Sequence, residues 1–132
     1  MLALDRLHGT RIVAAPATLD ALDAAAWPTS VTVLRFAPDD VFVIGAETVG
    51  VTGEHAIVAD ESGFVGCWLD ADQLAHVAEH IDWPLPTERP ALAQGFVASV
   101  PAKLYLVGDR ALLLTAAPYE HELSERLWGG RS

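Results

Sequence analysis

The stretch GFVASVPAKLYLVGDRALLLTA, residues 95–116, carries the pattern that decides the fold class. Its β-branched, aromatic and leucine residues predict three strands, at residues 95–100, 104–107 and 111–116. Gly108, Asp109 and Arg110 separate the last two strands and are typical of a tight turn. The C-terminal part of the chain is therefore expected to contain antiparallel strands.

Further strands are predicted upstream of this stretch. Residues 31–36 and 41–44 are rich in β-branched and aromatic side chains, and the APDD sequence at residues 37–40 favours a reversal between them. We therefore expect a hairpin at this position. Shorter strands are expected at residues 10–15, 56–59 and 64–69.

Three helices are expected between these strands. Thr18 can cap the first, which ends at Trp27-Pro28 because proline disfavours a helical conformation at the preceding residue. Asp70 and Gln73 can form a capping box at the start of the second, and Pro118 suits the first turn of the third. The residues expected on the inner faces are Leu19, Leu22 and Ala26, then Leu74, Val77, Ala78 and Ile81, and finally Tyr119, Leu123 and Leu127.

The two halves of the sequence repeat one order of features. A predicted helix, a Trp-Pro pair and strands joined by an aspartate-containing turn occur in residues 19–46 and again in residues 69–116. An internal duplication explains this repeat, and so does chance, because Trp-Pro helix ends and aspartate turns are common. With either explanation we expect one α+β domain over residues 1–132, with mostly antiparallel strands, about three helices and a flexible tail from about residue 129.

Composition narrows the classes of function. The net charge of −10 gives no electrostatic attraction to nucleic-acid phosphates or anionic lipids, so we expect neither as a partner. No apolar run reaches the ~20 residues of a membrane-spanning helix, and no signal peptide is recognisable, so a cytoplasmic location is expected. The hydrophobic share of 52% exceeds the ~45–50% of an average domain and favours a surface that a partner covers.

The sequence HVAEH at residues 76–80 matches the H-x-x-E-H pattern of a class of zinc peptidases. His76 and His80 stand four residues apart and could share one metal ion, with Glu79 between them as a base. Helical spacing places both histidines opposite Leu74 and Ile81, however, so we expect them to face solvent. A third ligand would have to come from the separate terminal helix, which contains Glu120, Glu122 and Glu125. We therefore prefer a solvated helix face to a metal site.

No side chain is identified as catalytic. Cys67, the single cysteine, cannot form an internal disulfide, and its apolar neighbours favour burial over a nucleophilic role. Ser62 does not lie in a G-x-S-x-G sequence, and no glycine-rich phosphate loop is present. Core positions are expected for three of the tryptophans, Trp27, Trp68 and Trp83. For Trp128, near the glycine-rich end, a core position and an interface position remain open.

Three stretches resemble a known family. DESGFVGCWLDADQL, residues 60–74, resembles a strand and helix start in folate-binding proteins of the aminomethyltransferase class. The segment from Pro90 to Trp128 is similar to the C-terminal part of the gamma subunit of heterotetrameric sarcosine oxidase, and LRFAPDDVFVIGA, residues 34–46, resembles an earlier strand of that subunit. The sequence departs from the family at Ala37, where glycine is usual, and after Trp68, where a glycine-proline pair is usual.

The resemblance implies an accessory role. In that family the gamma subunit supports larger subunits, to which the flavin, NAD and folate sites are attributed. We therefore expect a non-catalytic subunit without a cofactor of its own, with a larger enzyme subunit or a second copy as its partner. A second hypothesis is a stand-alone protein that binds folate or another small ligand, with Gly95, Phe96 and Lys103 near the pocket. A third is the metal-dependent hydrolase suggested by His76 and His80.

Overall fold

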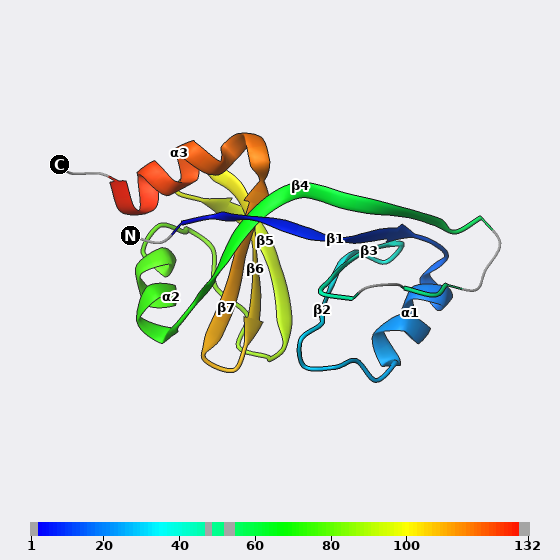
Figure 1. Cartoon of the computed structure of the whole chain (residues 1–132). Coiled ribbons are helices and arrows are strands. Elements are labelled where there is room, and N and C mark those ends of the chain that lie inside the picture. The colour runs from blue at the N-terminus through cyan, green and yellow to red at the C-terminus, as the bar shows by residue number, and fades with distance from the viewer. Residues whose placement is uncertain (1–2, 47–48, 52–54, 130–132) are drawn as a thin grey trace. The chain divides into compact units, whose positions relative to one another are not determined.

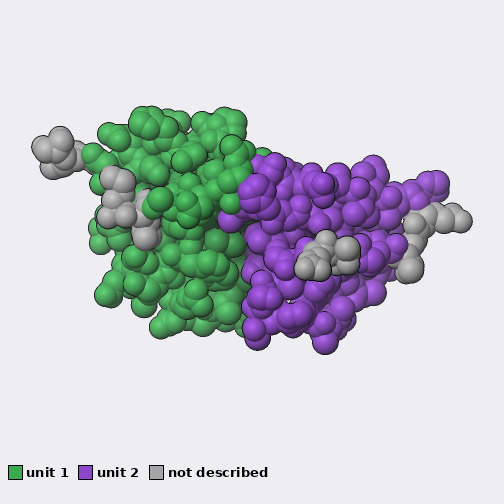
Figure 2. All heavy atoms as spheres, viewed as in Figure 1, with its two compact units in different colours: residues 1–6, 63–132 green, residues 7–62 purple. Residues whose placement is uncertain are grey.

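Two groups of strands, each with its own core, are present in the computed structural model, which describes residues 3–46, 49–51 and 55–129. Unit 1 comprises residues 1–6 and 63–132, and unit 2 comprises residues 7–62 (Figures 1 and 2). The elements are β1 (Asp5–Val13), α1 (Pro16–Ala24), β2 (Thr32–Ala37), β3 (Asp40–Ile44), β4 (Ile57–Leu69), α2 (Ala71–Ala78), β5 (Ala91–Val97), β6 (Val100–Val107), β7 (Arg110–Ala116), η1 (Ala117–Tyr119), α3 (Glu120–Ser124) and η2 (Glu125–Gly129).

The predicted α+β class is confirmed. The hydrogen-bonded strand order is β2-β3-β1-β4-β7-β6-β5, and the pairs β1–β3, β2–β3, β4–β7, β5–β6 and β6–β7 are antiparallel. Three α-helices are found within the described residues. None of the helices in these residues is long and apolar enough to cross a membrane.

In unit 1 the helices cover one face of the strands. Alternate residues of β6 are buried, because successive side chains of a strand point to opposite faces. The buried residues of β6 are Val100, Ala102, Leu104 and Leu106, and they form one core with Val77 of α2, Leu123 of α3 and Leu127 of η2. The intervening β6 residues Pro101, Lys103, Tyr105 and Val107 therefore belong to the opposite face of the strands.

Unit 2 has a smaller core, formed by α1 against its strands. Leu19 and Leu22 of α1 are buried, as their spacing predicts, and pack with Ile12, Val41 and Val43. The predicted hairpin is confirmed, since β2 and β3 pair in antiparallel register around the APDD turn.

The helix starts show one confirmed and one wrong prediction. Asp70 accepts a hydrogen bond from the Gln73 backbone, and Gln73 Oε1 accepts one from the Asp70 backbone, both at 2.8 Å, so the capping box is confirmed. Thr18 does not cap α1. That helix begins at Pro16 after Ala15, because proline fixes a helical φ and lacks only an N–H that would be unbonded in a first turn.

The prediction of one strand over residues 95–100 is also wrong. The chain reverses at Ala98 and Ser99, whose φ angles of 49° and 67° are left-handed, and Val97 pairs with Val100. Neither residue is typical of left-handed turn positions, which favour glycine, asparagine and aspartate. Instead, contacts from distant residues hold the turn, since the Ala98 N–H donates to His80 O at 2.7 Å and Ala98 O accepts from Arg126 at 2.8 Å.

The strands predicted at residues 56–59 and 64–69 are one continuous strand, β4. The polar residues Asp60 to Ser62 suggested a break in the sequence. In the structure the carboxylate of Glu61 pairs with the Arg11 guanidinium at 3.0 Å, and Arg11 also binds Asp40 at 2.6 Å. The charged side chain thus finds a partner on a neighbouring strand, so the extended backbone continues through the polar run.

The repeat seen in the sequence has a counterpart in the topology of each unit. Each contains a strand (β1 or β4), then a helix (α1 or α2), and later an antiparallel hairpin whose second strand (β3 or β7) pairs with the first strand. Aspartates occupy both hairpin turns, at Asp39 and Asp109. Unit 1 adds β5 and the C-terminal helices. The tail predicted to be flexible consists, beyond Gly129, of residues outside the described ranges.

Candidate functional site

His76 and His80 lie together on α2 and the turn after it, but His76 does not face solvent as predicted. Its ring nitrogen Nε2 lies 2.6 Å from the backbone oxygen of Leu127, and the ring stacks near Trp128 with centroids 6.4 Å apart. The two imidazoles meet edge to face at 5.2 Å. His76 is half-buried because α2 and η2 cover the same face of unit 1. His76 therefore connects α2 to η2 through its contacts with Leu127 and Trp128.

The glutamates considered as third ligands are not gathered at this pair. Glu122 forms an ion pair with Arg126 at 2.7 Å on α3 and η2. Across the described part of the chain, no group of three or more His, Cys, Asp or Glu side chains is arranged to hold a metal ion. Two imidazoles, one of which contacts a backbone carbonyl, offer an incomplete ligand set for a catalytic zinc.

Cys67 lies on β4 and is half-buried against the core of unit 1. Burial of the thiol and, to a smaller extent, the nearby negative charge of Asp5 raise its pKa to about 11. Because the thiolate is the nucleophilic form, a raised pKa leaves little of it at neutral pH, and we expect a structural role for Cys67. Ser62 is an exposed residue of the same strand.

All four tryptophans have defined surroundings. Trp27 Nε1 donates to Leu22 O at the end of α1, and Trp83 Nε1 donates to Phe96 O, both at 3.0 Å. Trp68 is not the core residue that was expected, because it remains 39% exposed with the Arg110 guanidinium stacked over its ring. Trp128 packs against the core of unit 1, which favours the core alternative for this residue.

An apolar concavity lies in unit 1, around Phe96, and we call it the Phe96 hollow. Its volume is about 260 Å³. It is lined by Phe64 of β4, Gln94, Gly95 and Phe96 of β5, Pro101, Ala102 and Lys103 of β6, Leu114, Thr115 and Ala116 of β7, and Tyr119 of η1. The three residues that the second hypothesis placed near a pocket, Gly95, Phe96 and Lys103, all line it.

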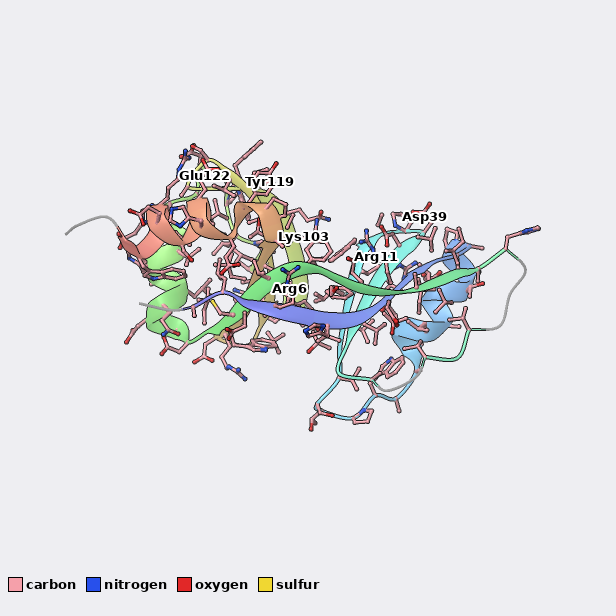
Figure 3. The ribbon with its side chains drawn as sticks, turned by 45° about the horizontal axis from the view of Figure 1, so that its top comes forward. Arg6, Arg11, Asp39, Lys103, Tyr119 and Glu122 are labelled. Atoms are coloured by element: carbon pink, nitrogen blue, oxygen red, sulfur yellow. The ribbon has the colours of Figure 1, made fainter. Side chains whose placement is uncertain are left out.

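Strand register brings these side chains together. Phe96 pairs with Pro101, Gln94 pairs with Lys103, and Lys103 pairs with Leu114. Paired residues on adjacent strands share a face, so this set lies on the face of the unit 1 strands opposite the helices. Tyr119 was predicted on the inner side of the last helix, but it is 39% exposed and borders the hollow instead. Figure 3 shows Lys103 and Tyr119 on this part of unit 1.

The polar groups of the hollow are few and ordered. The Lys103 ammonium donates to Gln94 Oε1 at 2.6 Å, and the buried Thr115 hydroxyl donates to Pro101 O at 2.7 Å. Among the residues that line the hollow, Lys103 is the one with a formal charge. The amide of Gln94 orients this ammonium group. The hollow thus combines an apolar floor with one positive group, which is a composition typical of small-molecule sites.

Unit 2 has a second, more polar concavity of about 410 Å³ next to His8, Thr10, Asp60 and Glu61. Asp60 and Glu61 are consecutive residues of β4, so their side chains point to opposite faces and do not form a carboxylate pair. The Glu61 carboxylate is held by Arg11.

Several residues of the Phe96 hollow were not identified from the sequence. Phe64, Pro101, Leu114, Ala116 and Tyr119 belong to four different elements and contain no motif. Within each strand, the two-residue alternation predicts which side chains share a face. It predicts which residues of different strands meet only once the register between the strands is known. Comparison of the chain with models of protein families, with curated proteins and with solved structures finds no match.

Proposed function

We propose that this chain is a non-catalytic accessory subunit that docks on a larger flavin- or folate-dependent enzyme through the Phe96 hollow. The observation that carries the proposal is the exposure of Phe96, whose side chain is 63% exposed at the edge of an apolar concavity. Burying one large apolar side chain contributes roughly 1.5–3 kcal/mol to the free energy of association. An exposed aromatic side chain that becomes buried in a complex therefore favours its formation.

Charge and sequence support the same role. Lys103 beside Phe96 can pair with a carboxylate on the docking partner, and such pairs fix the orientation of a complex. The resemblance to the sarcosine oxidase gamma subunit extends over the strands that form the hollow. In that family the cofactor sites are attributed to larger subunits.

Co-purification from the native host tests this proposal. Three tagged chains are compared, namely the wild type, Phe96→Ser and Ile57→Ser. The Ile57 variant is a matched control, because Ile57 is 64% exposed but belongs to unit 2 and is not among the residues that line the hollow. We expect a larger protein with bound flavin or folate, identified by mass and absorbance, with the wild type and with Ile57→Ser but not with Phe96→Ser.

Two results would contradict the proposal. A wild-type chain that stays monomeric and retains no flavin- or folate-dependent enzyme removes the accessory role. Equal recovery of such an enzyme with Phe96→Ser keeps the accessory role but places its docking surface elsewhere.

A second candidate function is the stand-alone binding of a small ligand. It is favoured by the position of Gly95, Phe96 and Lys103, which line one concavity. Trp83 contacts Gly95 and reports on changes there, so tetrahydrofolate binding should alter tryptophan fluorescence and raise the melting temperature. Titration without either change counts against folate as the ligand.

A further inference from the structure

We propose that the Phe96 hollow binds a small carboxylic acid that carries a single ring or a branched apolar group, with Lys103 as the partner of the carboxylate. The inference rests on the second candidate function for the choice of site and goes beyond it by specifying the ligand class. It concerns the chain alone, without a protein partner.

Size sets the first restriction on the ligand. The hollow has a volume of about 260 Å³. A cavity of roughly 150 Å³ holds a benzene molecule, whereas pockets for drug-sized ligands begin near ~300 Å³. The hollow therefore fits one ring with a short substituent. Larger molecules would extend out of it into solvent.

Wall chemistry sets the second restriction. The side chains of Phe64, Phe96, Pro101 and Leu114 are apolar, and the hydroxyl of the buried Thr115 already donates to Pro101 O. These walls favour an apolar ligand body, because a buried polar group without a partner would cost free energy. Phe96 is mostly exposed at the rim, where its ring offers an aromatic surface to a bound ring.

Charge sets the third restriction. Lys103 supplies the formal charge of the hollow, and its ammonium group is held by the neutral Gln94 amide at 2.6 Å. A carboxylate forms a charge-assisted hydrogen bond with an ammonium group, whereas a ligand amine would be repelled. Lys103 thus discriminates between acids, neutral amides and amines with the same apolar body.

The sequence offers a direct probe of this site, because Lys103 is the only lysine of the chain. Isotope-labelled lysine gives a single side-chain signal in an NMR spectrum, and the backbone signals of Gln94, Gly95 and Phe96 report on the opposite wall. The titration uses phenylacetate, with phenylacetamide and 2-phenylethylamine as neutral and cationic probes of matched shape. Lys103→Met is the test variant. Arg110→Met is the control, because Arg110 stacks on Trp68 and does not line the hollow.

We expect phenylacetate to shift the Lys103 signal and the signals of residues 94–96. A hydrogen bond to a charged group is worth about 1.5–3 kcal/mol, so the amide and the amine should bind about tenfold or more weakly, and Lys103→Met should weaken phenylacetate similarly. Arg110→Met should leave the affinity unchanged. If Lys103→Met fails to fold, comparison of the three probes on the wild type still decides the question.

Equal binding of the acid and the amide overturns the inference and leaves small-ligand binding in place. Shifts confined to residues away from the hollow overturn the inference as well. The absence of any shift with all three probes at millimolar concentration removes both the inference and the second candidate function. It does not affect the accessory role, which co-purification tests separately.

Discussion

The indole ring of Trp83 occupies the space that a side chain at Gly95 would need. A Cβ atom at residue 95 would lie 2.6 Å from Trp83 Nε1 and 2.8 Å from Cε2. The same Nε1 donates a hydrogen bond to Phe96 O at 3.0 Å. Trp83, which follows α2, thereby packs against β5 on the helix-covered face, opposite the face that carries the Phe96 hollow. Gly95 is required by this close packing.

We predict that Gly95→Ala destabilises the protein by about 1–3 kcal/mol, because the added methyl group displaces the indole from its packed position. Urea denaturation measures this change. Gly50→Ala is the control, since a Cβ at Gly50 meets nothing within 4 Å and should cause no loss of stability. Equal stability of wild type and Gly95→Ala would show that Trp83 does not pack on Gly95 in solution.

The capping box gives a second prediction. Asp70→Ala should lower the free energy of unfolding by about 1 kcal/mol, because the Gln73 N–H loses its acceptor at the start of α2. Asp82→Ala, a removal of the same charge from an exposed position outside the helix, should have a smaller effect. A loss no greater for Asp70→Ala than for Asp82→Ala would contradict the role of the cap.

Cys67 gives a prediction about pH. Because burial raises the pKa of its thiol to about 11, the rate of reaction with a thiol reagent should be very low at pH 7 and should increase up to about pH 11. A midpoint near the ordinary value of ~8.5 would contradict the buried environment of Cys67.

The same shift links Cys67 to stability. The unfolded chain loses the thiol proton at a lower pH than the folded chain. The contribution of Cys67 to the free energy of unfolding is therefore fully present below about pH 8.5 and is lost as the pH rises towards 11. Cys67→Ala should therefore reduce the fall in the free energy of unfolding between about pH 8.5 and pH 11, as measured by urea denaturation at several pH values.

The elements that were predicted correctly depend on local chemistry. The APDD hairpin, the capping box of Asp70 and Gln73, and the inward position of Leu19, Leu22, Leu123 and Leu127 follow from turn, cap and periodicity rules. The errors arise where tertiary contacts override such rules. His80 O and Arg126 hold the Ala98–Ser99 turn, and Arg11 keeps the polar residues of β4 in a strand.

The candidate site was predictable only in part. Gly95, Phe96 and Lys103 lie close together in sequence, so a guess about one stretch could include all three. Their neighbours Phe64, Leu114 and Tyr119 come from other elements, and their placement depends on strand register. The register in turn depends on the unforeseen turn at residues 98–99, since a shift by one residue would move Lys103 to the helix-covered face.

The central claim is that the Phe96 hollow is the surface at which this chain meets its partner. The most direct test is the rate at which Lys103, the single lysine, reacts with an amine-directed reagent in the free chain and in the complex recovered from the host. The account predicts a markedly slower reaction of Lys103 in the complex, measured as the increase in mass of this chain with time. The complex of the Ile57→Ser control should show the same slower reaction. An unchanged rate in a complex that contains the larger enzyme would contradict it.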